Sequence, residues 1–131
     1  MISMLTVMSA LVHDADAGAS YPMEVGAYSY VGGMPRDRHY YSYGYGTISG
    51  ALASTDEYQQ IGCGSYSGYG YTYGYCWAVD ASYNYASCVT DADHDFMDQI
   101  SMLNDLSYIM FTSEDGYCTS VYVYNSSAYA P

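Results

Sequence analysis

Large and small side chains alternate along much of the chain between residues 28 and 124. Segments with this alternation, or with many β-branched and aromatic residues, span residues 28–31, 41–48, 58–63, 69–79, 83–89, 108–112 and 117–124. Glycine, serine, asparagine and aspartate lie between them, as is typical of tight turns. The spacing predicts a mainly β fold, an antiparallel barrel or a sandwich.

One segment has a helical pattern instead. Phe96, Ile100 and Leu103 recur at the spacing that places side chains on one face of a helix. Thr90 and several aspartates precede them, a composition typical of a capped helix start. The pattern predicts one short helix, from about residue 92 to residue 103, that closes one side of the sheet.

Two segments carry tyrosine at every second position. Successive side chains of a strand point to opposite faces, so each segment predicts one tyrosine face and one glycine-rich face that another layer can approach closely. A flexible low-complexity tract is the alternative for residues 64–76. We interpret the tyrosines as a contact face, made of Tyr41, Tyr43, Tyr45, Tyr69, Tyr71, Tyr73 and Tyr75.

Tyrosine also dominates the composition. The chain of 131 residues fits one domain and contains 20 tyrosines, whereas valine, isoleucine, leucine and phenylalanine are scarce. Each large aromatic side chain buries about 150–250 Å². We therefore expect tyrosine to supply much of the buried area of the core.

The first twenty residues differ from the rest. Residues 2–12 are apolar, and as an extended arm they would place Met4, Leu5, Val7 and Leu11 over both of its faces. A secretion signal is the alternative, but no positively charged residue precedes the apolar run. We divide the chain into an arm or strand at residues 1–20 and one β-rich domain at 21–131. We expect the arm to pair with its own sheet or with a neighbouring subunit.

The charge balance excludes several partners. Asp and Glu number 14 against two basic residues, and the formal net charge is −12. Nucleic acid needs clustered Lys or Arg to neutralise its phosphates, so we expect no nucleic-acid partner. No apolar run reaches the length of a membrane-spanning helix. An acidic surface of this kind attracts cations.

Four cysteines, Cys63, Cys76, Cys88 and Cys118, lie far apart in the sequence. Zinc sites usually contain a close cysteine pair, which is lacking here, so two disulfides are the better interpretation. Of the possible connectivities we favour Cys63–Cys76 with Cys88–Cys118, because it pairs near neighbours. Disulfides indicate an oxidising compartment, and we expect an extracellular or cell-surface location.

No residue pattern indicates catalysis. His13, His39 and His94 each have a nearby carboxylate in the sequence, but a catalytic group is recognised by its spatial partners. Nucleophile, phosphate-loop, zinc-protease and dinucleotide motifs are missing. We predict that the protein is not an enzyme and needs no cofactor.

A calcium loop is the weak metal candidate. Asp91, Asp93 and Asp95 place oxygens at alternate positions, as at the start of such a loop. Phe96 then stands where the sharp turn needs glycine, and Met102 stands where a glutamate should close the loop. We interpret the aspartates as the acidic first turn of a helix. The triplet at Asn125 matches the N-glycosylation pattern.

Residues 45–131 carry a family likeness. The residues concerned are Tyr58-Gln59-Gln60-Ile61-Gly62-Cys63, Cys76-Trp77-Ala78-Val79-Asp80, Cys88, Ser107-Tyr108-Ile109-Met110-Phe111, Cys118 and the aromatic ending from Val121 to Pro131. In cysteine order and ending, this part resembles small exported, disulfide-containing bacterial proteins of unassigned function. The resemblance implies export, a β-rich domain and two disulfides, and it implies no catalytic residues.

The functional expectation is a structural subunit of an extracellular filament or surface assembly. The tyrosine faces, and a strand donated by the N-terminal arm, would hold a homo-oligomer or homopolymer together. The alternative is a secreted carbohydrate-binding module whose tyrosines stack on a glycan, and a disulfide-stapled inhibitor or small enzyme is a third reading. Polar side chains usually flank the aromatic residues of a sugar site. Glycine and serine flank these tyrosines, which favours assembly.

Overall fold

The structure is a computed structural model that describes residues 21–92 and 94–131. The arm at residues 1–20, with Met4, Leu5, Val7 and Leu11, and also His13 and Asp93, lie outside the described residues. The predictions made for them stay predictions.

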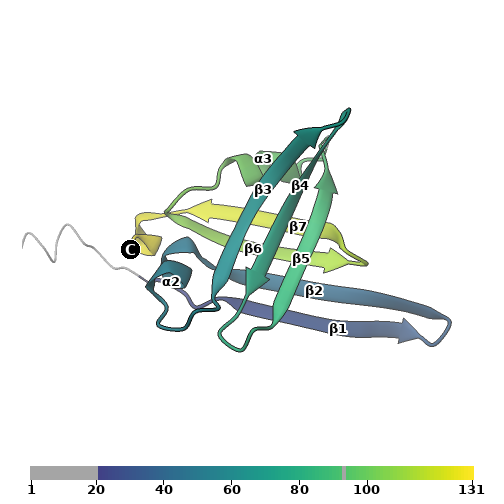
Figure 1. Cartoon of the computed structure of the whole chain (residues 1–131), viewed down its shortest axis with the longest axis horizontal. Coiled ribbons are helices and arrows are strands. Elements are labelled where there is room, and N and C mark those ends of the chain that lie inside the picture. Colours follow the sequence, from purple (N-terminus) through teal and green to yellow (C-terminus); the bar gives the residue numbers. More distant parts are fainter. Residues whose placement is uncertain (1–20, 93) are drawn as a thin grey trace, which may run out of the picture.

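The described chain is mainly β, as the alternation predicts (Figure 1). Its elements are β1 (Gly26–Met34), β2 (Asp37–Thr47), α2 (Ile48–Ala53), β3 (Gln60–Gly68), β4 (Tyr71–Val79), β5 (Tyr85–Asp91), α3 (Phe96–Ser101), β6 (Ser107–Glu114), β7 (Tyr117–Asn125) and η1 (Ser127–Tyr129). The strands form one 7-stranded sheet in the order β1-β2-β6-β7-β5-β4-β3. The sheet is not closed into a barrel, because β1 and β3 are its two edge strands.

The sheet folds into two layers. Strands β1, β2, β6 and β7 pair antiparallel in one ladder, and β3, β4 and β5 pair antiparallel in the other. A single parallel residue pair, Val89 with Tyr117, joins β5 to β7 and so joins the ladders. In Figure 1 the three strands β3, β4 and β5 run diagonally across the other layer, which gives a sandwich-like arrangement.

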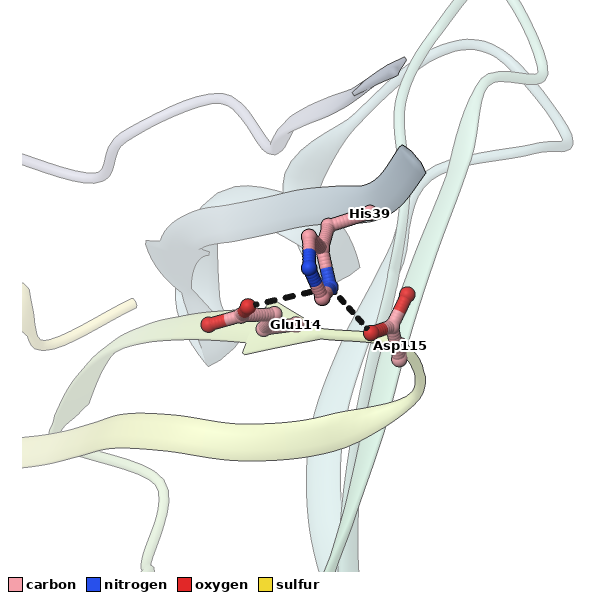
Figure 2. Close-up of side chains that lie close together, drawn as sticks. All are labelled: His39, Glu114 and Asp115. Carbon is pink, nitrogen blue, oxygen red and sulfur yellow. Dashed lines mark hydrogen bonds and ion pairs between the residues drawn. The ribbon is translucent and has the colours of Figure 1, made fainter. Parts of the chain in front are cut away.

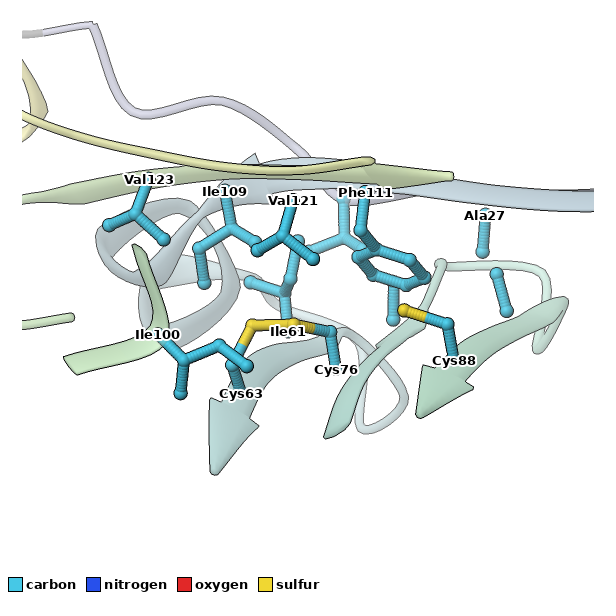
Figure 3. Close-up of a cluster of buried hydrophobic side chains, with 13 residues drawn as sticks. Ala27, Ile61, Cys63, Cys76, Cys88, Ile100, Ile109, Phe111, Val121 and Val123 are labelled. Carbon is cyan, nitrogen blue, oxygen red and sulfur yellow. A yellow bond between two sulfur atoms is a disulfide. The ribbon is translucent and has the colours of Figure 1, made fainter. Parts of the chain in front are cut away.

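The core lies between these layers. Phe111 and Ile109 of β6, with Val121 and Val123 of β7, face the half-cystines and small residues of β3, β4 and β5 (Figure 3). The expectation that tyrosine fills the core is wrong: among the described residues, no tyrosine belongs to the buried set. Small side chains such as Gly44 and Ala78 let the layers approach closely, and Phe111 is the one aromatic residue in the buried set of the described chain.

Gly44 shows how close the layers come. A Cβ atom on this residue would lie 2.6 Å from the Cβ of Ala78 on the opposite layer and 2.7 Å from Cζ of Phe111. Gly74 of β4 fills the same role under α3, where an added Cβ would collide with Met97. The predicted glycine faces are therefore the inner faces, and the tyrosines alternating with them point outward.

The turns and helices depart from the sequence prediction in detail. Strand β4 begins at Tyr71, because Tyr69 and Gly70 form the turn with φ of 52° and 84°. The helix predicted over residues 92–103 is shorter, Phe96–Ser101, because the backbone through Asp91 stays in β5. Its Ile100 is buried in the core.

A second short helix, α2, occupies Ile48–Ala53, where the sequence predicts the end of a strand and a loop. Thr47 begins it: the Thr47 side chain accepts a hydrogen bond from the Gly50 backbone N–H at 2.9 Å. The same oxygen accepts one from the Met23 N–H at 2.9 Å. Contacts with a segment distant in sequence thus stabilise a helix whose own residues give little helical signal.

Two disulfides are present, and their pairing is the one that the spacing favours. Cys63–Cys76 lies within the β3–β4 ladder, where the two residues are direct cross-strand partners. Cys88–Cys118 connects β5 to β7, one in each layer. No free cysteine remains among the described residues. In the same part of the chain, no helix has the length and apolar character needed to cross a membrane.

Candidate functional site

The outer face of the β3–β4 hairpin carries a continuous row of aromatic rings. We name this row the β4 aromatic ladder, made of Tyr66, Tyr71, Tyr73, Tyr75 and Trp77. Ring centroids of neighbours along β4 lie 6.0 Å, 6.1 Å and 5.7 Å apart, from Tyr71 to Trp77. Tyr66 of β3 lies 5.3 Å from Tyr73, its cross-strand partner. These separations are typical of stacked and tilted aromatic pairs.

Glycines of β3 allow the rings to lie flat against the sheet. An added Cβ on Gly62 would meet the Trp77 ring at 2.9 Å, and one on Gly64 would meet the Tyr75 hydroxyl at 2.8 Å. The rings of Tyr75 and Trp77 therefore lie over strand β3 and are half-buried, whereas Tyr66 and Tyr71 are exposed.

A second aromatic surface covers the opposite side of the sandwich. We name it the β2 tyrosine face, made of Tyr28, Tyr30, Tyr41, Tyr43, Tyr45, Tyr108, Tyr122, Tyr124 and Tyr129. Across β1 and β2, Tyr28 stacks on Tyr43 with centroids 4.8 Å apart, and Tyr30 stacks on Tyr41 at 5.1 Å. Met110 of β6 lies between the tyrosines of β2 and β7, since it pairs with Tyr45 and with Tyr122.

Three hydroxyls of this face have a raised pKa. A hydrogen bond with Tyr28 and partial burial raise the pKa of Tyr45 above its ordinary value. Burial, together with neighbouring tyrosines, raises the pKa of Tyr108. Burial and the nearby Glu114 carboxylate raise the pKa of Tyr41. These three hydroxyls therefore lose their protons at a higher pH than an ordinary tyrosine does.

One depression adjoins the β4 aromatic ladder. It has a volume of about 340 Å³ and is lined by Tyr71, Tyr73, Val89, Thr90, Asp91 and Tyr117. Asp91 places a carboxylate beside two tyrosine rings there. This is the combination of aromatic surface and polar group that orients a sugar.

A different chemistry is found where the β1–β2 and β6–β7 hairpins meet. Tyr41 of β2 pairs with Glu114 at the end of β6, and His39 precedes Tyr41 by two positions, on the side of the β1–β2 turn. The His39 ring therefore reaches Glu114 and the following turn residue, Asp115 (Figure 2). His39 Nδ1 lies 2.7 Å from Asp115 Oδ2 and 3.3 Å from Glu114 Oε1. We name this group, with Asp37, the His39 cluster.

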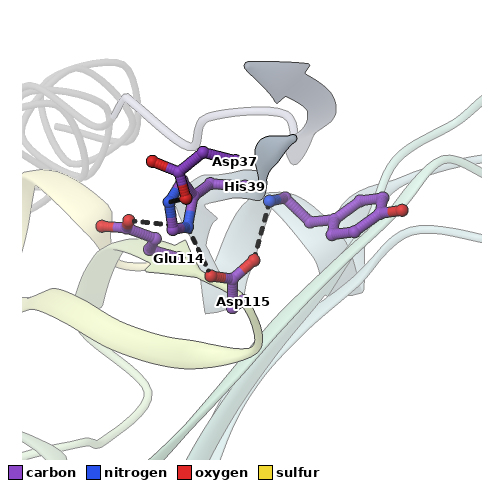
Figure 4. A network of polar contacts seen from close by, with 5 residues as sticks. Asp37, His39, Glu114 and Asp115 are labelled. Carbon is purple, nitrogen blue, oxygen red and sulfur yellow. Dashed lines mark hydrogen bonds and ion pairs between the residues drawn. The ribbon is translucent and has the colours of Figure 1, made fainter. Parts of the chain in front are cut away.

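Both ring nitrogens of His39 face carboxylates. Nε2 lies 3.0 Å from Asp37 Oδ1, on the side away from Asp115 (Figure 4). An ionised carboxylate only accepts hydrogen bonds, so the ring donates from both nitrogens when it is protonated. The hydrogen bond to Asp115 raises the pKa of His39 above its ordinary value, against a smaller opposing effect of partial burial.

Asp115 is held by the backbone as well. Its Oδ1 accepts a hydrogen bond from the Tyr40 N–H at 2.9 Å, and its own N–H donates to the Tyr40 carbonyl. The Tyr40 N–H, followed by His39, lowers the pKa of Asp115. Asp115 and Gly116 form the β6–β7 turn with φ of 52° and 87°, which fixes the direction of the carboxylate.

The structure brings together most, but not all, of the predicted contact residues. Tyr71, Tyr73 and Tyr75 lie in the β4 aromatic ladder, and Tyr41, Tyr43 and Tyr45 lie in the β2 tyrosine face on the other side. The contact face is thus two surfaces, not one. Tyr69 belongs to neither, because its turn position leaves it 95% exposed beyond the end of the ladder.

The weak calcium candidate is not assembled in the part of the chain that the structure describes. Asp91 ends strand β5, and Asp95 precedes α3 without a capping hydrogen bond from its side chain. Asp93 lies outside the described residues. Among the described residues, His39, Glu114 and Asp115 form the one group of metal-ligand type whose ligand atoms lie within 4.8 Å of one another.

Several surface residues escape the sequence analysis. Tyr66 and Trp77 complete the β4 aromatic ladder, and period-two spacing from Tyr75 to Trp77 was the available signal. Glu114 and Asp115 lie between the predicted strand segments 108–112 and 117–124, where the sequence indicates only a turn. Their proximity to His39 depends on the β2–β6 pairing, which no local pattern contains.

No known protein family matches this chain, and no curated protein or solved structure shows significant similarity to it. The resemblance of residues 45–131 to small exported proteins stays a prediction. The function therefore has to be argued from the surfaces themselves.

Proposed function

We propose that the protein is a structural subunit of an extracellular assembly, in which copies stack through their tyrosine faces. One observation carries the proposal: none of the described tyrosines is buried in the core, and most of them lie on two outer surfaces on opposite sides of the sandwich. Soluble monomers rarely expose large contiguous apolar patches, and such patches mark interaction sites. The disulfides support an oxidising, extracellular location.

The placement of the two surfaces favours open assembly. A contact between two copies of the same surface closes into a dimer if only one such surface exists. Here the β4 aromatic ladder of one copy can meet the same ladder of a second copy, while the β2 tyrosine face on the far side stays free for a third. Two self-complementary surfaces on opposite sides therefore propagate a chain of subunits.

Charge makes this assembly dependent on salt. With a net charge of −12, copies repel each other in dilute buffer. The repulsion is screened within a Debye length of about 8 Å at physiological ionic strength. We expect assembly to strengthen as salt is added, since the contacts themselves are uncharged rings.

The sheet edges offer a second kind of contact. Strands β1 and β3 are the two edges of the described sheet, and each pairs with one neighbour only. We propose that the arm at residues 1–12 adds as a strand to such an edge of the next subunit. Deletion of residues 1–12 should then leave a folded, disulfide-bonded domain with impaired polymerisation. If the deletion variant is unfolded, the arm belongs to the core of its own subunit.

The test is electron microscopy and sedimentation of the purified protein in a salt series. The wild type is expected to form filaments or large oligomers. The double variants Tyr73→Ser/Tyr75→Ser and Tyr28→Ser/Tyr43→Ser should each reduce the assembly to small oligomers, because each disables one of the two surfaces. Tyr21→Ser is the matched control, because Tyr21 is exposed and lies outside both surfaces.

Circular dichroism must show that both double variants remain folded. A wild type that stays monomeric at physiological salt and high concentration would overturn the proposal. So would double variants that assemble as the wild type does.

Carbohydrate binding is the second candidate function. The depression beside the β4 aromatic ladder favours it, since Asp91 lies next to Tyr71 and Tyr73 there. Titration of soluble polysaccharides against the wild type and Asp91→Asn tests it. Binding that is lost in Asp91→Asn, in a protein that stays monomeric, would establish this function in place of assembly.

A further inference from the structure

The His39 cluster has the ligands and the supporting contacts of a metal site. One imidazole nitrogen and two carboxylates converge from β2 and the β6–β7 turn, and their ligand atoms lie within 4.8 Å of one another. Glu114 and Asp115, on one side of the group, follow His39 in the sequence by 75 and 76 positions. The site belongs to neither aromatic surface and has no role in the proposed function.

The histidine is oriented as metal-bound histidines are. A metal-ligating His almost always donates its other ring N–H to a carboxylate, which fixes the tautomer and the ring plane. Nε2 lies 3.0 Å from Asp37 Oδ1, and when the neutral ring carries its proton on Nε2, the Nδ1 lone pair is directed toward Glu114 and Asp115. Asp37 thus occupies the outer position that this arrangement requires.

The carboxylate of Asp115 is oriented in the same way. Its Oδ1 is occupied by the Tyr40 N–H, and its Oδ2 is the atom that lies 2.7 Å from His39 Nδ1. His39 is therefore held through Nε2 and Asp115 through Oδ1, and the metal would bind the other atom of each side chain, Nδ1 and Oδ2. Glu114, which has the longer side chain, is the third ligand, and its Oε1 lies 3.3 Å from Nδ1.

The ligand types select the class of ion. Calcium and magnesium take oxygen ligands, whereas imidazole suits zinc and the other late first-row divalent ions. Zinc binds nitrogen and carboxylate oxygen at about 2.0–2.2 Å, so small rotations of three partly exposed side chains are enough to surround it. The side chains of His39, Glu114 and Asp115 are 34%, 42% and 43% exposed, which leaves the remaining coordination positions open to water.

We propose that His39, Glu114 and Asp115 bind a divalent transition-metal ion of the zinc class, with Asp37 positioning the imidazole. The ion takes the place of the proton on Nδ1, and that proton leaves to solvent. The competing explanation is a purely structural ion pair, in which a protonated His39 clamps the two hairpins together. The two explanations give opposite results in a binding experiment.

The experiment is calorimetric titration of Zn²⁺ into the full-length protein after removal of metal with a chelator. A complex of one ion per chain is expected, and His39→Ala should weaken it by at least about tenfold. Asp37→Asn should weaken it by about 10- to 100-fold, as loss of an outer-shell carboxylate does. Co²⁺ should give visible absorption bands of a nitrogen- and oxygen-ligated ion in the wild type and lose them in His39→Ala.

His94→Ala is the matched control. His94 is the other histidine among the described residues, and its ring stacks on Phe96 with centroids 3.8 Å apart, outside the cluster. This variant should bind Zn²⁺ with unchanged affinity. Absence of Zn²⁺ binding, or equal binding by wild type and His39→Ala, would overturn the proposal and leave the ion-pair clamp.

Discussion

Cys88 and Cys118 form the covalent connection between the two layers, with their Cα atoms 4.9 Å apart. They adjoin Val89 and Tyr117, the single residue pair through which a strand of one ladder pairs with a strand of the other. The Val89 N–H donates to the Gly116 carbonyl at 2.9 Å at the same place. The other disulfide, Cys63–Cys76, lies within one ladder that is already paired along its whole length.

This difference predicts unequal effects of removing the two disulfides. The Cys88→Ala/Cys118→Ala variant should lose about 3–4 kcal/mol of unfolding free energy, because its closed loop is long and because it ties the layers together. Cys63→Ala/Cys76→Ala, the matched control, should lose less. Urea denaturation of the two double variants measures both values. Equal losses would show that the interlayer position has no special effect.

The closeness of the layers at Gly44 leads to a second prediction. Gly44→Ala should destabilise the protein by about 1–3 kcal/mol, since the added methyl group meets Ala78 and Phe111 in a packed core. Gly64→Ala is the control, because its methyl group would meet only the hydroxyl end of Tyr75, which can rotate away. Thermal denaturation of both variants decides. A Gly44→Ala protein as stable as the control would show that the layers can separate at little cost.

Thr47 is the subject of a third prediction. Its fully buried hydroxyl oxygen accepts from the Met23 and Gly50 N–H groups, so Thr47→Val leaves the buried Gly50 N–H and the part-buried Met23 N–H without this acceptor. We expect a loss of at least about 1–3 kcal/mol in unfolding free energy. Thr119→Val makes the same chemical change at an exposed strand position and should have little effect. Hydrogen exchange of the Gly50 amide should accelerate in Thr47→Val only.

Asp56 gives a pH-dependent prediction. Its carboxylate accepts from the Gln59 side chain at 2.7 Å and from the Gln59 and Tyr58 N–H groups at 2.9 Å each, and these bonds lower the pKa of Asp56. A carboxyl group whose pKa is lower in the folded protein than in the unfolded chain stabilises the fold at pH values above the unfolded pKa. That stabilisation is lost as the pH falls through the folded pKa.

Asp56→Asn should therefore be less stable than the wild type at neutral pH, and the difference should shrink as the pH falls below the ordinary Asp value of 3.8. Urea denaturation at several pH values measures the difference. Glu57→Gln removes one negative charge at the adjacent exposed position and serves as the control. A difference between Asp56→Asn and wild type that is the same at pH 7 and pH 3 would contradict the assignment.

Local patterns in the sequence were enough to predict much of the fold. Period-two alternation located the strands because it depends only on neighbouring residues of one strand. It also separated tyrosine faces from glycine faces, and Gly44 and Gly74 lie on inner faces as this separation requires. Near-neighbour spacing was sufficient for the disulfide pairing, since Cys63 and Cys76 belong to one hairpin.

The sequence also led to errors where a local signal had two outcomes. Tyr69 continued the alternation but became a turn residue, since Gly70 after it allows the tight reversal. The aspartates before α3 suggested a longer helix, but pairing with β4 keeps Asp91 in a strand. In both places, pairing between strands decided against the local preference.

The sequence by itself determined that this chain forms short strands with one tyrosine side and one small-residue side. Only the tertiary structure decided which side faces the core. The small residues face the core because Gly44 and Ala78 let the two layers approach closely, whereas tyrosine hydroxyls need water or a hydrogen-bond partner. The His39 cluster was likewise beyond local prediction, since it joins residues 76 positions apart and exists only because β2 pairs with β6.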